Sequence, residues 1–264
     1  MTLMNEIAQS VTAEDIIDAL VSMRDDRQCE ILMRFFKTGP GQYGQGDRFL
    51  GLKVPLTRSV VRDIRLRVSL SEIEKLLRSE WHEVRLCGFL LIVEEMKAAL
   101  PRRREHPCVR AGRREELVRF YLDNARRANN WDLVDLSCGK ILGSYLLYPQ
   151  ADGSMPSRDI LDRLAVSTDL WEQRIAIVTT LELIRARQFD DTLRIGHKLL
   201  SHPHDLIHKA VGWALRELGK RDIDLLRDFL DEHYDYIPRT TLRYAIERMD
   251  PVERHSWLDR KSKG

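Results

Sequence analysis

The 264-residue sequence is poor in cysteine, glycine, proline and aromatic residues. Its 14 glycines and 9 prolines are too few for a fibrous protein, and its 43 % apolar content is too high for a disordered one. The 4 cysteines form no CxxC pair, which is typical of reduced thiols in a cytosolic protein. No stretch approaches the ~20 uncharged apolar residues that span a bilayer, and the first residues lack the basic segment and apolar core of a signal peptide. We therefore expect a globular cytoplasmic protein with no membrane-spanning segment.

Charged residues are abundant and nearly balanced, with 43 Lys+Arg against 41 Asp+Glu and a net charge of +2. The exception is the segment 101–114, where six arginines stand against the single acidic residue Glu105. Two prolines and Gly112 interrupt this segment, so we expect an exposed basic loop. Such a run is more often a solvated connector than a nucleic-acid contact, and it assigns no function by itself.

Apolar residues recur at helical spacing along most of the chain, as in the stripe formed by Ile16, Ile17, Leu20 and Val21. The alternating pattern of strands joined by hairpin turns is missing. The sequence therefore predicts an all-α protein. We expect a single domain over residues 1–264, with a repetitive core from about residue 12 to 250.

A weak internal repeat runs through this core. Each of five segments has a polar opening, a charged position and an apolar helix. The charged positions are Arg85, Asp135, Arg174, Lys209 and Arg243. They are separated by 50, 39, 35 and 34 residues, and the basic loop falls within the first gap. Spacings of this size are typical of two-helix solenoid repeats, which stack into a superhelical array with one concave face.

Four of the five charged positions are cations, which suits a polyanion bound along a concave basic groove. Alternatively, these side chains pair with acidic neighbours and stiffen the repeats. Asp135 is the exception in the row. A carboxylate among phosphate-binding cations is costly unless it faces a positively charged ligand or transition state.

Three tryptophans accompany this row. Trp131 lies one helical turn before Asp135, and Trp171 and Trp213 fall in the next two repeats. Core packing is the usual role of tryptophan. The alternative is that these rings, together with the cations, hold a nucleotide by stacking.

Two further segments attract attention for their composition. The glycine-rich segment 39–47 lacks the Gly-Lys-Ser/Thr of a phosphate-binding loop, so we expect a tight loop from which Tyr43 could contact DNA. His202, His204 and His208 have no acidic or cysteine partner that would complete a ligand set. We therefore expect no metal site.

The segments Trp131–Asp135, Leu170–Arg174 and His208–Arg216 together resemble the AlkD family of DNA alkylation-repair glycosylases. Residues 37–51 and 238–245 also resemble this family, and the similarity extends over roughly residues 30–250. The resemblance implies HEAT-like repeats that bind duplex DNA in a concave groove. It further implies hydrolysis of the N-glycosidic bond of N3- or N7-alkylated purines, with the damaged base left stacked in the duplex rather than flipped out.

The resemblance also implies roles for individual residues. Asp135 would be the catalytic carboxylate, Trp131 and Trp213 would flank the deoxyribose, and Arg174 would bind a nearby phosphate. The expected further DNA contacts are Arg85, Lys209, Arg216, Arg243 and Tyr43. An alkylpurine is already cationic and leaves without a general acid, so Asp135 would stabilise the oxocarbenium-like sugar and position water.

The expected protein is thus a monomeric enzyme that needs no metal, cofactor or obligate protein partner. Two alternatives remain open at this point. The family includes relatives that bind branched DNA without glycosylase activity, so the groove could serve binding alone. The third possibility is a helical-repeat scaffold for protein interactions, in which the cations pair with acids and Asp135 is incidental.

Overall fold

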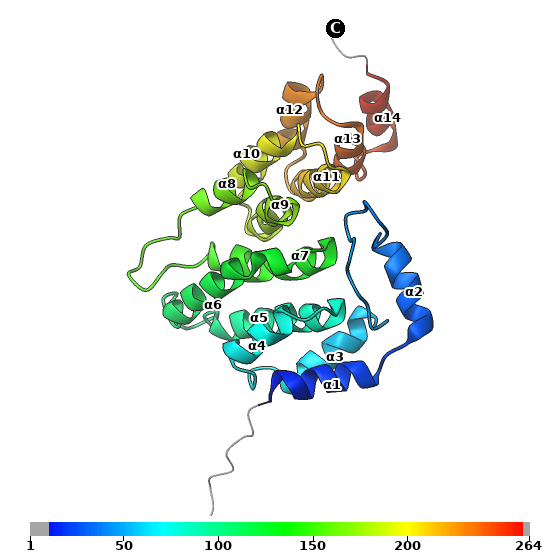
Figure 1. Cartoon of the computed structure of the whole chain (residues 1–264). Coiled ribbons are helices and arrows are strands. Elements are labelled where there is room, and N and C mark those ends of the chain that lie inside the picture. The colour runs from blue at the N-terminus through cyan, green and yellow to red at the C-terminus, as the bar shows by residue number, and fades with distance from the viewer. Residues whose placement is uncertain (1–10, 261–264) are drawn as a thin grey trace, which may run out of the picture. The chain divides into compact units, whose positions relative to one another are not determined.

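The computed structural model describes residues 11–260. Every regular element in this range is helical, and the only β-type pairing found there is an isolated bridge between Arg48 and Trp81. The prediction of an all-α fold is therefore confirmed (Figure 1). Residues 1–10 and 261–264 lie outside the described part, and they include the first residues, which were assessed for a signal peptide. No helix among the described residues combines the length and the apolar character needed to cross a membrane.

The chain divides into two compact units, each with its own core. Within the described part, the first unit comprises residues 11–105 and 112–137, and the second comprises residues 106–111 and 138–260. The helices of the first unit are α1 (Ala13–Ser22), α2 (Asp26–Phe35), α3 (Val54–Ile64), α4 (Leu70–Leu77), α5 (His82–Ala99), α6 (Ala111–Asp123), a 3-10 turn (Ala125–Arg127) and α7 (Trp131–Cys138).

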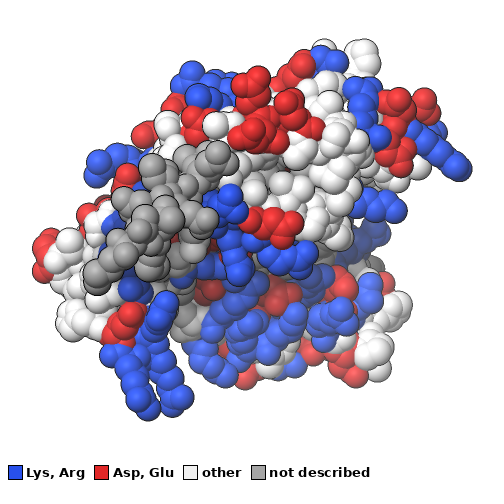
Figure 2. Space-filling model, turned by 90° about the horizontal axis from the view of Figure 1, so that it is seen from below, with Lys and Arg blue, Asp and Glu red and all other residues white. Residues whose placement is uncertain are grey.

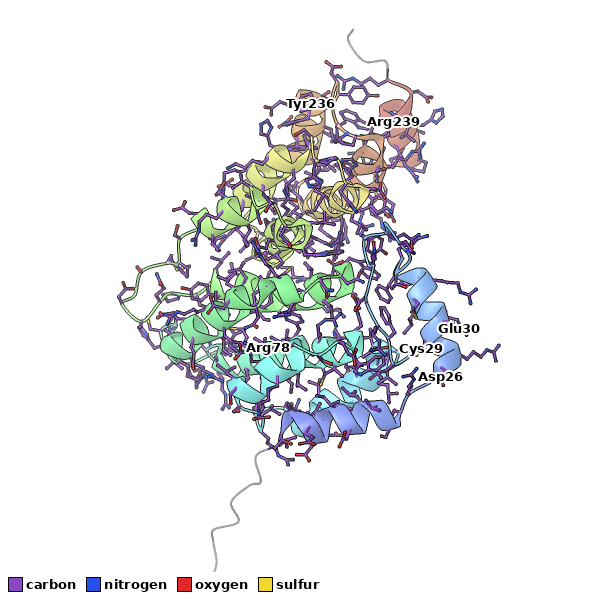
Figure 3. All side chains as sticks on the ribbon, viewed as in Figure 1. Asp26, Cys29, Glu30, Arg78, Tyr236 and Arg239 are labelled. Atoms are coloured by element: carbon purple, nitrogen blue, oxygen red, sulfur yellow. The ribbon has the colours of Figure 1, made fainter. Side chains whose placement is uncertain are left out.

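Helix α5 forms the centre of the first unit. Of its 18 residues, 14 are buried, and it packs against α1, α3 and α4. A helix that is apolar on all sides must be enclosed by neighbours, which is why the sequence of α5 shows no polar face. Side chains fill the space around it (Figure 3). On α2, Cys29 points inward and donates its S–H to the Phe49 carbonyl at 3.0 Å, whereas Glu30 points away from the unit.

Polar residues fix where several helices begin. Thr12 and Asp15 form a reciprocal capping box at α1, and the Asp25 side chain accepts from the Gln28 amide at 3.0 Å to begin α2. In the second unit, Asp169 accepts from the Trp171 amide at 2.9 Å and so begins α9. Side-chain oxygens at this position satisfy amides that have no partner inside the helix.

The second unit is an array of paired helices. Its inner helices α9, α11 and α13 contact one another in order, and α8 and α10 pack together along the outside. Each helix also packs against the next one in the chain from α8 to α12, which is the packing of two-helix repeats. The elements are a π-helical turn (Gly139–Gly143), α8 (Asp159–Ala165), α9 (Leu170–Arg185), α10 (Asp190–Leu199), α11 (Asp205–Gly219), α12 (Ile223–His233), α13 (Arg239–Ala245) and α14 (Pro251–Asp259).

Gly212 permits the close contact between α11 and α13. A Cβ atom at this position would lie 2.5 Å from the Tyr244 Cβ atom and 2.7 Å from the Thr241 carbonyl oxygen. Neither of these atoms can move aside without displacing a helix. The small residue therefore sets the spacing of the last two inner helices.

The basic loop is shorter than expected. It ends at Arg110, and residues 111–114 form the first turn of α6 instead. Arg114 is fully buried, and its Nη1 donates to the Ala99 carbonyl at 3.1 Å, at the end of α5. Burial of Leu117 and Tyr121 holds this helix in place, and one glycine in the first turn is tolerated. The exposed arginines of the loop proper are Arg102, Arg103, Arg104 and Arg110.

Candidate functional site

Four of the five charged positions occupy the same place in their helices. Asp135, Arg174, Lys209 and Arg243 are each the fifth residue of the helix that carries them, namely α7, α9, α11 and α13. Arg85 is the fourth residue of α5. One residue corresponds to a rotation of about 100° around a helix, so Arg85 does not share the place that the other four have in their helices.

Arg85 is a buried ion-pairing residue. Its side chain is 7 % exposed, and its Nη2 atom donates to Asp47. Its Nη1 atom donates to the carbonyls of Ser79 at 2.9 Å and Glu80 at 3.1 Å. No part of the guanidinium is placed to receive a phosphate, so the expected DNA contact at Arg85 is not supported. The alternative of pairing with an acidic neighbour describes this residue instead.

The cations of α11 and α13 differ in their surroundings. Lys209 pairs with Asp205 at 2.7 Å, one turn earlier on α11, and Arg216 pairs with Glu247. Arg243 is exposed and forms no ion pair within residues 11–260. Exposed ion pairs of this kind contribute at most ~1 kcal/mol, so Lys209 can exchange its partner for a phosphate at small cost. On the face seen in Figure 2, acidic side chains stand beside basic ones.

Arg174 is held at the junction of two repeats. It is 5 % exposed, and its Nη1 donates to the Leu206 carbonyl at 2.6 Å, in the first turn of α11. Trp213 is half-buried on α11, one turn after Lys209. The second unit therefore carries Arg174, Lys209 and Trp213 on two adjacent inner helices.

Trp131 and Asp135 lie together in the first unit, on α7. The Asn130 Oδ1 atom accepts from the Trp131 amide at 2.9 Å where the helix begins. The Trp131 ring stacks on Phe36 with ring centroids 5.3 Å apart, and it meets Phe35 edge to face at 5.9 Å. Phe35 is itself 59 % exposed.

Trp131 and Asp135 both line a pocket of about 420 Å³. The pocket lies between α2, α5, α7 and the segment 36–55. Most of its lining residues are apolar, and the polar ones are Lys53, His82, Glu83, Asp132 and Asp135. Phe35, Phe36 and Phe49 supply its other aromatic walls. Asp135 thus stands at the wall of an aromatic pocket.

His82, which also lines this pocket, is the centre of a buried network of charged residues. The His82 Nδ1 atom is 2.8 Å from Asp47 Oδ2, and its Nε2 atom is 2.9 Å from Asp132 Oδ2. Burial alone would lower the pKa of His82, but Asp132 and then Asp47 raise it to about 9. Burial alone would raise the pKa of Asp47, yet His82 and Arg85 hold it below its ordinary value. His82 is therefore an imidazolium shared by two carboxylates at neutral pH.

A second buried acid fixes the segment next to the pocket. The Glu83 carboxylate accepts from three consecutive amides, those of Leu50 at 2.8 Å, Gly51 at 2.9 Å and Leu52 at 3.0 Å. Gly51 has a φ of +87°, and a Cβ atom there would lie 2.2 Å from the Asp25 carbonyl oxygen. The first residues of α5 therefore anchor the segment that closes one side of the pocket.

The structure places the predicted residues as two sets, one in each unit. Tyr43, Arg85, Trp131 and Asp135 belong to the first unit, with Tyr43 half-buried in the segment between α2 and α3. The set in the second unit comprises Arg174, Lys209, Trp213, Arg216 and Arg243. Within the part of the chain that is described, no cluster of three His, Cys, Asp or Glu residues is arranged to hold a metal ion.

The sequence analysis missed the network around His82. Asp132 stands between the two predicted residues Trp131 and Asp135, and His82 is the first residue of α5, of whose 18 residues 14 are buried. Both are polar residues at positions that should be buried, and such residues require a partner. That signal was available, but the partner Asp47 lies 35 residues before His82 and could not be identified by spacing.

Comparison with known proteins gives consistent results. A family model described as DNA alkylation repair enzyme matches residues 16–249. The structure is similar to that of a predicted DNA alkylation repair enzyme from Enterococcus faecalis, with a TM-score of 0.60 and 16 % sequence identity. The similarity covers 86 % of this chain and 97 % of the other, and it shows a shared fold. No curated protein matches the sequence.

Proposed function

Because the chain belongs to the DNA alkylation repair enzyme family, we propose that it is a DNA glycosylase acting on cationic N3- or N7-alkylated purines in duplex DNA. Family membership indicates a role in the repair of alkylated DNA. The observation that carries the narrower proposal is the position of Asp135 and Trp131 at the wall of an aromatic pocket. A carboxylate beside an aromatic face is suited to a positively charged sugar ring.

The proposed reaction needs one carboxylate. The C1′–N bond breaks with its electron pair going to the alkylpurine, which is thereby neutralised and leaves without a proton donor. Asp135 stabilises the oxocarbenium-like sugar and accepts the proton of the water that adds to C1′. Trp131 packs against the same sugar from the preceding turn of α7. The base stays stacked in the duplex throughout.

The proposal also gives roles to residues of the second unit. Trp213 flanks the deoxyribose and Arg174 binds a phosphate near the lesion, and the chain acts as one repeat domain with a DNA-binding groove. The further contacts to the duplex are Lys209, Arg216, Arg243 and Tyr43. Arg85 has no part in this proposal, because its two terminal nitrogens already donate to Asp47 and to the carbonyls of Ser79 and Glu80. The protein acts as a cytoplasmic monomer and needs no metal, cofactor or protein partner.

Release of free base from methylated duplex DNA tests this proposal. Wild-type protein is incubated with methylated and unmethylated duplex, and the free bases are separated by chromatography. Release from the methylated duplex alone supports a glycosylase. No release from protein that binds the duplex with a steep salt dependence would indicate a binder of damaged or branched DNA instead. Neither release nor binding would indicate a protein-interaction scaffold, which the ion pairs of Lys209 and Arg216 favour.

A further inference from the structure

His82 connects three parts of the first unit that are distant in sequence. It is the first residue of α5, and its two ring nitrogens reach Asp47, before α3, and Asp132, in the first turn of α7. Asp132 directly follows Trp131 and lies three residues before Asp135. The contact between His82 and Asp132 thus acts on the turn that carries both proposed site residues of this unit.

The imidazole is fixed in orientation as well as in position. Each of its ring nitrogens lies within 2.9 Å of a carboxylate oxygen, and Phe49 stacks on the ring with centroids 4.4 Å apart and an interplanar angle of 21°. The Asn130 Nδ2 atom donates to Asp47 Oδ2 at 3.4 Å, which links the residue before α7 to the same acid. A ring held at both edges and on one face cannot rotate to release either carboxylate.

The charged groups around His82 favour a cation at this position. Asp47 and Asp132 face it directly, and Arg85 reaches it only through Asp47. Glu83 also lines the pocket, but backbone amides occupy both of its oxygens. Lys53 and Asp135 line the same pocket. Replacing the cation by a neutral group would leave the buried Asp132 carboxylate uncompensated, and α7 would have to shift its first turn toward water.

We propose that His82 is a positioning residue for glycosidic bond hydrolysis, which as a cation shared by Asp47 and Asp132 fixes the first turn of α7 and thereby places Trp131 and Asp135 against the sugar. The kinetic consequence rests on the proposed function, since it requires that Asp135 acts on the substrate. A displacement of about 1 Å in such a group costs on the order of 100-fold in rate.

The test compares two substitutions at this position. His82→Gln removes the charge, whereas His82→Arg keeps a permanent cation with several donors. His255→Gln, at an exposed histidine of α14, is the matched control. Single-turnover base release from a duplex with one N7-methylguanine is measured from pH 6 to pH 10.5, with enzyme-free release subtracted. The Kd for the same duplex is measured in parallel.

We expect His82→Gln to release base 10- to 100-fold more slowly than wild type at pH 7.5, with a Kd within about twofold. His82→Arg restores the rate at pH 7.5. The wild-type rate declines as the pH rises through about 9, where His82 loses its proton, and the rate of His82→Arg shows no such decline. A decline in wild-type protein that is still folded at that pH separates positioning from loss of the fold.

A second measurement needs no substrate. Hydrogen exchange of the amides at residues 131–135 should be faster in His82→Gln than in wild type and slow again in His82→Arg. Wild-type protein that releases no base would refute the proposed function. Hydrogen exchange at residues 131–135 would still test whether His82 fixes the first turn of α7. Equal exchange in wild type and His82→Gln, a wild-type release rate in His82→Gln, or an Arg variant as slow as the Gln variant would each overturn the inference.

Discussion

Because His82 is a cation between two carboxylates in the folded protein, we expect the protein to lose stability in alkaline solution. Burial opposes the charge, but Asp132 and Asp47 raise the pKa of His82 from its ordinary value of 6.5 to about 9 in the folded state. Because the folded pKa lies above the unfolded one, the stabilisation is fully present below pH ~6.5 and is lost as the pH rises through about 9. At ~1.4 kcal/mol per pH unit, this difference amounts to roughly 3 kcal/mol of unfolding free energy.

Urea unfolding at pH 6 and pH 10 measures this loss. Lysine and tyrosine side chains also titrate in this range, so wild type is compared with His82→Arg, in which the charge is permanent. Their contributions are shared by both proteins and cancel in the comparison. We expect wild type to lose about 3 kcal/mol more than the variant between the two pH values. Equal losses in the two proteins would refute the assignment of a shared imidazolium at this position.

Two further predictions concern the segment beside the pocket and the DNA-binding face. Gly51→Ala should destabilise the protein by roughly 2–4 kcal/mol in urea unfolding, because its Cβ would strike the Asp25 carbonyl. Gly153→Ala, with a similar φ but open space around it, should cost only about 1 kcal/mol, and equal costs would contradict this account. Lys209→Gln and Arg243→Gln should each reduce the slope of log Kd against log salt concentration by about 0.9, measured by titration of duplex DNA, and unchanged slopes would remove both residues from the interface.

The sequence was sufficient to predict the helical fold and the repeat. Period-3.6 apolar stripes are local signals, and the spacing of Arg174, Lys209 and Arg243 reflects one repeat packing on the next. The same regularity placed Asp135 at the fifth position of its helix. The repeat did not predict the position of Arg85. Tertiary contacts of His82 and Glu83 determine where α5 begins, so Arg85 is the fourth residue of its helix instead of the fifth.

The charged network around His82 could not be predicted in the same way. Asp47, His82 and Asp132 come from three segments, and no periodic pattern links them. Only packing shows that Asp47 meets His82 rather than solvent. The burial of Arg114 could not be predicted for a related reason. The sequence around Arg114 is polar, but Leu117 and Tyr121 on the same helix are buried, and their packing places the first turn of α6 in the core.

The role of Asp135 is the central claim, and a single substitution tests it most directly. Single-turnover release of N7-methylguanine is compared in wild type, Asp135→Asn and the matched control Glu30→Gln, which changes an exposed carboxylate of the same unit. We expect Asp135→Asn to be about 10²- to 10³-fold slower, with duplex affinity unchanged or higher because a negative charge is removed, and Glu30→Gln to match wild type. Release by Asp135→Asn at the wild-type rate would contradict the account.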